Sequence, residues 1–94
     1  MFSLTATPAD NGFVILALTG NVSEDVLPEI HRLIDRGRRI DGRVALDLSE
    51  VTLMDRMSAR FFAEQLQRGI ELVDCPSYLK GWILREITND RTDI

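Results

Sequence analysis

The sequence has little of what disulfides, metal sites and membrane spans require. Its 94 residues include one cysteine, Cys75, and one histidine, His31, so we expect neither an intramolecular disulfide nor a metal site. No segment reaches the roughly 20 apolar residues that cross a bilayer, and the first residues lack the basic and apolar regions of a signal peptide. We therefore expect a cytoplasmic protein that is not inserted in a membrane.

Positive charge is also in deficit. Lysine and arginine total 11 against 15 acidic residues, a formal net charge of −4, which would repel a phosphate backbone. The exception is a local group of arginines, namely Arg32, Arg36, Arg38, Arg39 and Arg43. Because no aromatic residues or groove-reading motif accompany them, we interpret them mainly as a solvated helix end, where cations suit the negative pole. Nucleic acid is not an expected partner.

Catalytic motifs are missing as well. No serine lies in a nucleophile elbow and no glycine-rich phosphate loop is present. His31 has no second histidine to complete a metal site and is predicted to lie on the surface. A chain this short also leaves little room for a deep cleft. We expect a protein that is not an enzyme and holds no cofactor.

The composition, with 45% hydrophobic and 28% charged residues, is that of a globular protein. We predict one domain over residues 1–87 and a frayed polar tail over 88–94.

The first third of the chain predicts a hairpin followed by a helix. Strands are expected over 2–7 and 13–18, the second buried on both faces and closed by Gly20 and Asn21. The residues between the strands favour a turn: Pro8, Asp10, Asn11 and Gly12. A helix should begin near Val26. Its cap would be Asp25, with Ser23 and Glu24 beside it and Pro28 in the first turn, and Asp41 and Gly42 would end it.

Two further strand and helix pairs follow. A buried strand over 43–48 leads into a connector over 49–54, and Asp55 should cap a helix that runs to about Arg68. Asp47, near the end of the strand, is expected to bond loop amides. A strand over 70–73 and a helix opened by Pro76 complete the chain, with a shared core face predicted for Tyr78, Leu79, Trp82 and Ile83. The predicted fold is α/β, with a mixed sheet of about four strands and about three helices in the order β-β-α-β-α-β-α.

The segment from Val44 to Ile83 resembles the STAS family, whose founding members are anti-sigma-factor antagonists of bacterial partner-switching circuits. The resemblance is carried by the residues 44–51, by Asp55 at a helix start, by the residues 69–73 and by Pro76 before the last helix. It implies a single STAS-like domain that acts in transcription regulation by binding another protein.

Family members typically carry Asp-Ser-Ser-Gly at this helix start, and a partner kinase that is also an anti-sigma factor phosphorylates the first serine. Here the residues are Asp55-Arg56-Met57-Ser58. Arg56 has no hydroxyl group, so the resemblance implies no phospho-switch at that position. Ser58 is an alternative acceptor if its hydroxyl is accessible, and Thr52 is a weaker one.

The same helix predicts a binding surface. Met57 and Phe61 are spaced four residues apart and are flanked by charged residues, an arrangement found in protein interfaces. A third helix that covered both side chains would leave them in the core instead, and Asp55 needs no role beyond capping. The candidate partner-binding residues are Asp55, Arg56, Met57, Ser58, Arg60, Phe61 and Glu64.

We therefore predict a non-enzymatic protein-interaction module that binds a regulatory protein such as a kinase-like anti-sigma factor. We expect an acidic or carbonyl-rich patch of the partner opposite Arg56. Two alternatives stay open: a small cytoplasmic subunit of an ATP-driven lipid transporter, and a sensor of a nucleotide or small ligand. A homodimer is compatible with the sequence.

Overall fold

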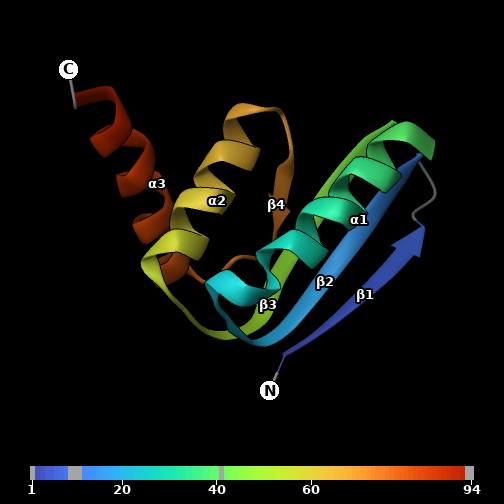
Figure 1. Cartoon of the computed structure of the whole chain (residues 1–94), viewed down its shortest axis with the longest axis horizontal. Coiled ribbons are helices and arrows are strands. Elements are labelled where there is room, and N and C mark those ends of the chain that lie inside the picture. The colour runs from blue at the N-terminus through green and yellow to red at the C-terminus, as the bar shows by residue number, and fades with distance from the viewer. Residues whose placement is uncertain (1, 9–11, 41, 93–94) are drawn as a thin grey trace.

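The computed structural model describes residues 2–8, 12–40 and 42–92, with backbone only for residues 40 and 88–92. Four strands are present: β1 (Phe2–Pro8), β2 (Phe13–Val22), β3 (Arg43–Met54) and β4 (Glu71–Val73). The helices are a short 3-10 turn, η1 (Glu24–Val26), and three α-helices, α1 (Leu27–Ile40), α2 (Arg56–Gln67) and α3 (Ser77–Thr92). The predicted order and the mixed α/β class are confirmed (Figure 1). The predicted turn residues Asp10, Asn11 and Asp41 lie outside the described residues.

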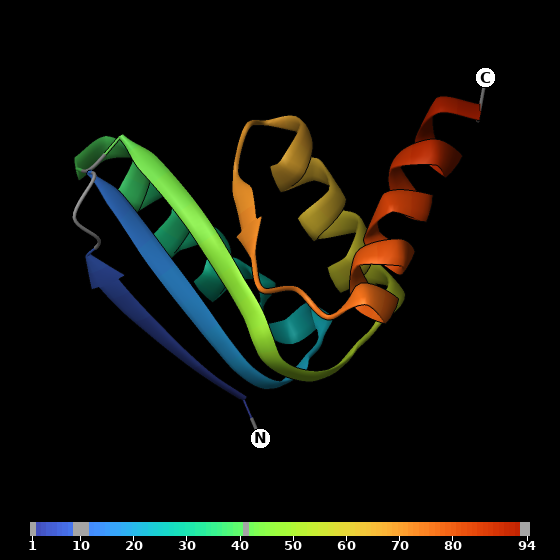
Figure 2. The same cartoon turned by 180° about the vertical axis from the view of Figure 1, so that it is seen from behind.

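The sheet is mixed, with strand order β1-β2-β3-β4. The hairpin strands β1 and β2 are antiparallel, whereas β3 runs parallel to both β2 and β4. The helices α1 and α2 form the crossovers between the parallel strands, and both lie on one face of the sheet (Figures 1 and 2). No described element covers the opposite face, and α3 lies beside α2 at the β4 side of the sheet.

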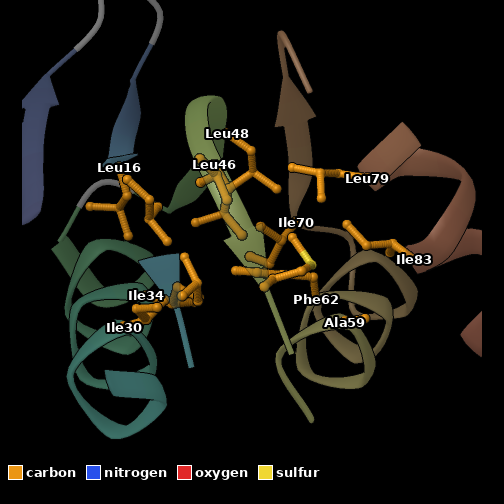
Figure 3. Close-up of a cluster of buried hydrophobic side chains, with 14 of the residues drawn as sticks. Leu16, Ile30, Ile34, Leu46, Leu48, Ala59, Phe62, Ile70, Leu79 and Ile83 are labelled. Carbon is orange, nitrogen blue, oxygen red and sulfur yellow. The ribbon is translucent and has the colours of Figure 1, made fainter. Parts of the chain in front are cut away.

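The core lies between the sheet and these helices. Figure 3 shows Leu46 and Leu48 of β3 between the side chains of α1 and Phe62 of α2. These side chains are at most 1% exposed, and burying each one contributes about 1.5–3 kcal/mol. The largest side chains in this layer include Leu16, Leu18, Ile30, Ile34, Leu46, Leu48, Phe62, Leu79 and Ile83.

The strand β2 is buried on one face only, so the prediction of burial on both faces is wrong. Val14, Leu16 and Leu18 face the helices and are buried, while Ile15 and Ala17 on the opposite face are half-buried. An apolar run of this kind is typical of a strand covered on both faces. Here the described helices cover only one face of β2, because α1 and α2 lie on the same side of the sheet.

Two strands are longer than predicted. The strand β2 continues to Val22, and β3 includes residues 49–54, which we predicted to be a connector. Their pairing shifts register twice, between Ala17 and Thr19 and between Gly20 and Asn21. Gly20 has φ +90°, a conformation that glycine adopts without strain. It therefore serves an irregularity within the strand and does not end it.

The start of the first helix also differs from the prediction. The chain enters through η1, and α1 begins at Leu27, with Pro28 in its first turn. Asp25 is not at the cap position of α1, because it lies within η1. Its carboxylate accepts a hydrogen bond from the Ser23 hydroxyl.

Gly37 lets α1 approach the sheet closely. A Cβ atom at this position would lie 2.6 Å from Val14 Cγ1 and 2.9 Å from Val44 Cγ2. Contacts below 3.0 Å would force a shift of the helix or the strands. The glycine therefore sets the distance between α1 and the two central strands.

The last helix differs from the prediction in orientation. It runs to Thr92, and the predicted fraying of residues 88–94, of which 93 and 94 lie outside the described residues, stays a prediction. Leu79 and Ile83 are buried as predicted, whereas Tyr78 is 65% exposed and Trp82 is half-buried. The predicted core role of Tyr78 is wrong, because α3 packs against α2 beside the sheet and buries a narrower stripe than a helix covering the sheet would.

Candidate partner-binding surface

Asp55 joins the starts of two helices. Its Oδ1 accepts a hydrogen bond from the Ser58 amide at 2.8 Å, as a helix cap should, and its Oδ2 accepts one from the Glu24 amide at 3.0 Å. The hydrogen bond from the Ser58 hydroxyl, supported by the amide bonds, holds the pKa of Asp55 below its ordinary value despite some desolvation. One carboxylate thus ties the entry of α2 to the entry of η1.

Ser58 is fully buried, with 0% exposure. Its hydroxyl oxygen lies 2.6 Å from Asp55 Oδ1 and 3.1 Å from the Val22 carbonyl oxygen. A hydroxyl has one proton, so two acceptors compete for it. The accessibility that a phospho-acceptor at Ser58 would need is absent, and the side chain instead connects α2 to the end of β2. Thr52 is exposed and donates to Asn21 Oδ1 at 3.0 Å.

Arg56 is at once exposed and paired. Its side chain is 70% exposed, and its Nε lies 3.7 Å from Glu86 Oε2 on α3. Arg60, one turn further along α2, places its Nε 4.0 Å from Glu86 Oε1. Glu86 is only 4% exposed. The arginine at the expected phosphorylation position therefore helps to hold α3 against α2, and Glu86 offsets one of the two positive charges.

Sequence reasoning missed Glu86. A signal was present, because Glu86 follows Leu79 by seven residues and Ile83 by three, which puts it on the buried stripe of α3. A carboxylate on such a stripe needs a partner. Only the packing of α3 on α2 identifies Arg56 and Arg60 as those partners.

Met57 and Phe61 have different roles although they share a helix face. Met57 is 46% exposed. Phe61 is half-buried. Its ring forms T-shaped pairs with the ring of Phe62, with centroids 5.5 Å apart, and with the ring of His31 on α1, with centroids 6.3 Å apart. His31 is exposed as predicted and lies 3.7 Å from Asp35 Oδ2. Phe61 therefore anchors the surface, and Met57 is the apolar side chain that it presents.

We define the α2 surface by its five residues, Arg56, Met57, Arg60, Phe61 and Glu64. Glu64 is exposed one turn beyond Arg60. Beside this surface, α3 carries an open hollow of about 480 Å³ lined by Tyr78, Trp82, Arg85 and Glu86. Glu86 lines this hollow and pairs with Arg56 and Arg60 of the α2 surface, so the exposed Tyr78 and the half-buried Trp82 of α3 lie beside that surface.

The described residues contain no candidate metal site. They include no group of three or more histidine, cysteine, aspartate or glutamate side chains placed to hold a metal ion. Cys75 is a free thiol whose pKa is raised by burial. None of the helices in this part of the chain combines the length and apolar character needed to cross a bilayer.

Asp47 has the predicted structural role, because its Oδ1 accepts a hydrogen bond from the Ser49 amide at 2.9 Å.

No family model matches the sequence, and no curated protein matches it significantly. Among solved structures, the chain is similar to an uncharacterized protein of the DUF3478 family from Shewanella loihica PV-4, which has a SpoIIAA-like fold. The TM-score is 0.52 at 11% sequence identity, and the match covers 76% of this chain and 61% of that one. The chain thus spans less than two thirds of the length of that protein.

This likeness shows the fold. The chain has a SpoIIAA-like α/β fold, the fold of STAS domains and anti-sigma-factor antagonists. The resemblance found in the sequence is therefore confirmed at the level of the fold.

Proposed function

We propose that this chain is a non-enzymatic, cytoplasmic protein-interaction module that binds a regulatory protein, such as a kinase-like anti-sigma factor, through the α2 surface. The observation that carries the proposal is Met57, an apolar side chain 46% exposed between Arg56 and Arg60 on a helix fixed at its start. Methionine adapts to varied partner surfaces, and arginine is enriched in binding hot spots. The SpoIIAA-like fold supports the same assignment.

The complementary partner surface has an apolar pocket bordered by acidic groups. The pocket would receive Met57, and the acidic groups would face the guanidinium group of Arg56, whose side chain is 70% exposed. Such charge complementarity raises the association rate more than the affinity. We expect association to slow as salt concentration rises.

We further propose that this binding is constitutive. Arg56 cannot accept a phosphoryl group, and the Ser58 hydroxyl is buried between Val22 and Asp55. A phosphate at the start of a helix places about −2 charge on the surface. This helix start offers no exposed serine to receive it, and the exposed hydroxyl of Thr52 lies in β3 and donates to Asn21. The partner's state would then depend on the amounts of the two proteins and on signals acting elsewhere.

The test is affinity capture with the immobilised chain from a lysate of the organism that encodes it, read by mass spectrometry. Met57→Asp should reduce recovery of the regulatory partner about tenfold or more, as for a central hot spot. Leu84→Asp is the matched control, because Leu84 is also 46% exposed but lies on α3. It should recover the partner as the wild type does.

Two results would contradict the proposal. Equal recovery by the wild type and Met57→Asp would place the interface elsewhere on the molecule. Recovery of a transporter ATPase in place of a regulatory protein would instead support the role of a transporter subunit.

A further inference from the structure

The opposite end of the helix pair carries a concentration of arginines from separate elements. Arg38 and Arg39 lie in the last turn of α1, Arg43 begins β3, and Arg68 is the C-cap of α2. We call these four residues the arginine pole. Figure 1 shows the end of α1, the end of α2 and the start of β4 at the same upper edge of the molecule. The sequence grouped three of these arginines but gave no reason to add Arg68, which is 25 or more residues away.

Two hollows at this edge share the same arginines. The first, about 160 Å³, is lined by Arg38, Arg43 and Arg68 together with Phe13 and the turns at Gly42 and Gly69. The second, about 330 Å³, is lined by Asp35, Arg38, Arg39 and Arg68. Arg38 and Arg68 therefore stand between the two hollows and belong to both.

Among the described side chains at this pole, positive charge exceeds negative charge. The side chains lining the hollows include four guanidinium groups and two carboxylates, Asp35 and Glu71. Glu71 lies 3.4 Å from Arg43, and Asp35 lies 3.7 Å from His31. Among the residues whose side chains are described, Arg38, Arg39 and Arg68 form no ion pair. The excess is local, because the whole chain has a net charge of −4.

Helix dipoles explain part of this arrangement. The C-terminal pole of a helix is equivalent to about half a negative charge, so the ends of α1 and α2 together offset about one arginine. Arg43 begins β3, where it pairs with Glu71 and its guanidinium carbon lies 4.1 Å from the centroid of the Phe13 ring. Solvated helix ends therefore do not account for the convergence of three elements on two adjoining hollows.

We propose that the arginine pole binds a small soluble anion that carries adjacent phosphate groups. A guanidinium group is planar and donates paired hydrogen bonds that match the oxygens of a phosphate. One phosphate would occupy each hollow, with Arg38 and Arg68 reaching both. The hollows lie at or below the lower end of the range for ligand pockets, so they suit a compact anion better than a peptide. This site is separate from the α2 surface and does not depend on the proposed function.

The test is titration of the full chain with tripolyphosphate at low and moderate salt, followed by calorimetry and by amide chemical shifts. We expect saturable binding with the largest shifts at Gly42 and Gly69. Arg38→Gln and Arg68→Gln should each weaken binding about tenfold, as expected for the loss of a charge-assisted contact. Arg36→Gln removes the same charge from the same helix but lines neither hollow, so it should change the affinity less than about twofold.

The comparison between variants decides the outcome once each is shown to unfold at the wild-type temperature. Equal weakening by Arg36→Gln and Arg68→Gln, or an absence of saturable binding, would overturn the proposal, because only diffuse charge would then be at work. Tighter binding of hexaglutamate than of tripolyphosphate would also overturn it. ATP in a parallel titration identifies the source of the phosphates: equal affinity indicates a free oligophosphate, and higher affinity indicates a nucleotide.

Discussion

The two ends of the α1 and α2 pair use their charged residues in opposite ways. At the helix starts, Asp55 accepts hydrogen bonds from two segments, and Arg56 and Arg60 share the buried Glu86. At the helix ends, Arg38 and Arg68 line open hollows without an ion pair to any described side chain. At the helix starts, the charged side chains form contacts within the chain and Met57 is exposed beside them. At the helix ends, the arginine side chains line hollows that a ligand could enter.

This difference predicts different costs of mutation at the two ends. Charged residues at the helix starts should contribute to the free energy of unfolding, while those at the helix ends should contribute little. Both ends rely on the same close packing of α1 against the sheet, which can be tested first because the expected effect is the largest.

Gly37→Val should lower the free energy of unfolding by about 3 kcal/mol, through overpacking. The new side chain would meet Val14 and Val44, which already lie within 3.0 Å of the position of a Cβ atom. Urea denaturation of both proteins measures the change. Gly81→Val, on the open side of α3 where a Cβ atom meets nothing within 4 Å, is the matched control and should cost little. An equal cost for both variants would show that the α1 contact is not tight.

Asp55→Ala should lower the free energy of unfolding by about 2 kcal/mol, the upper range for a helix cap. The value lies at this upper end because the carboxylate also serves the Glu24 amide and contacts the buried Ser58 hydroxyl. Asp35→Ala, an acidic residue on α1 without a capping role, is the comparison variant. A cost for Asp55→Ala no greater than that for Asp35→Ala would contradict the double cap.

The same carboxylate gives a pH dependence. Because the pKa of Asp55 in the folded state is lowered from 3.8, its contribution to stability is fully present above pH 3.8 and is lost as the pH falls through the folded-state pKa. The difference in stability between the wild type and Asp55→Asn should therefore shrink below pH 3.8. Denaturation curves for both proteins between pH 2 and pH 7 measure it, and a difference that stayed constant would show that the carboxylate does not bind these donors preferentially.

Glu86→Gln should lower the free energy of unfolding by about 1 kcal/mol. Removing the buried carboxylate leaves Arg56 and Arg60 without its charge, but both arginines are exposed and the distances are long, so the cost stays well below that of breaking a fully buried pair. Thermal unfolding at low and high salt measures it. Since screening weakens exposed pairs, the wild type should lose more stability in salt than Glu86→Gln does.

Arg68→Gln should change the free energy of unfolding by less than about 0.5 kcal/mol, as expected for a surface residue without a structural partner. This is the smallest expected change in the free energy of unfolding, and it is smaller than the change expected for Glu86→Gln. Urea denaturation of the variant measures it. A loss as large as that for Glu86→Gln would show that the arginine pole is a structural element.

Short-range relations were predictable from the sequence, and long-range ones were not. The cap of Asp55 on Ser58 follows from a spacing of three residues. The second bond of Asp55, to Glu24, spans 31 residues and depends on where β2 and β3 end. The contact of Glu86 with α2 and the position of Arg68 near Arg38 and Arg39 were missed for the same reason.

The errors in the strands have a related cause. Ser49 and Glu50 are polar and suggested a connector, but paired strands tolerate polar residues at a register shift when one face of the sheet is open. Tyr78 was predicted to be buried because helix periodicity identifies the buried face but not how wide the buried stripe is, whereas Trp82 does pack against the core. The position of α3 beside α2 determined that width.

We propose the α2 surface as the interface, and hydrogen exchange of the chain, free and in complex with its captured partner, tests this assignment. We expect added protection over residues 56–64 of α2, with little change at the open sheet face around Ile15 and Ala17. Protection confined to that sheet face, with α2 exchanging as in the free chain, would rule out the α2 surface as the interface.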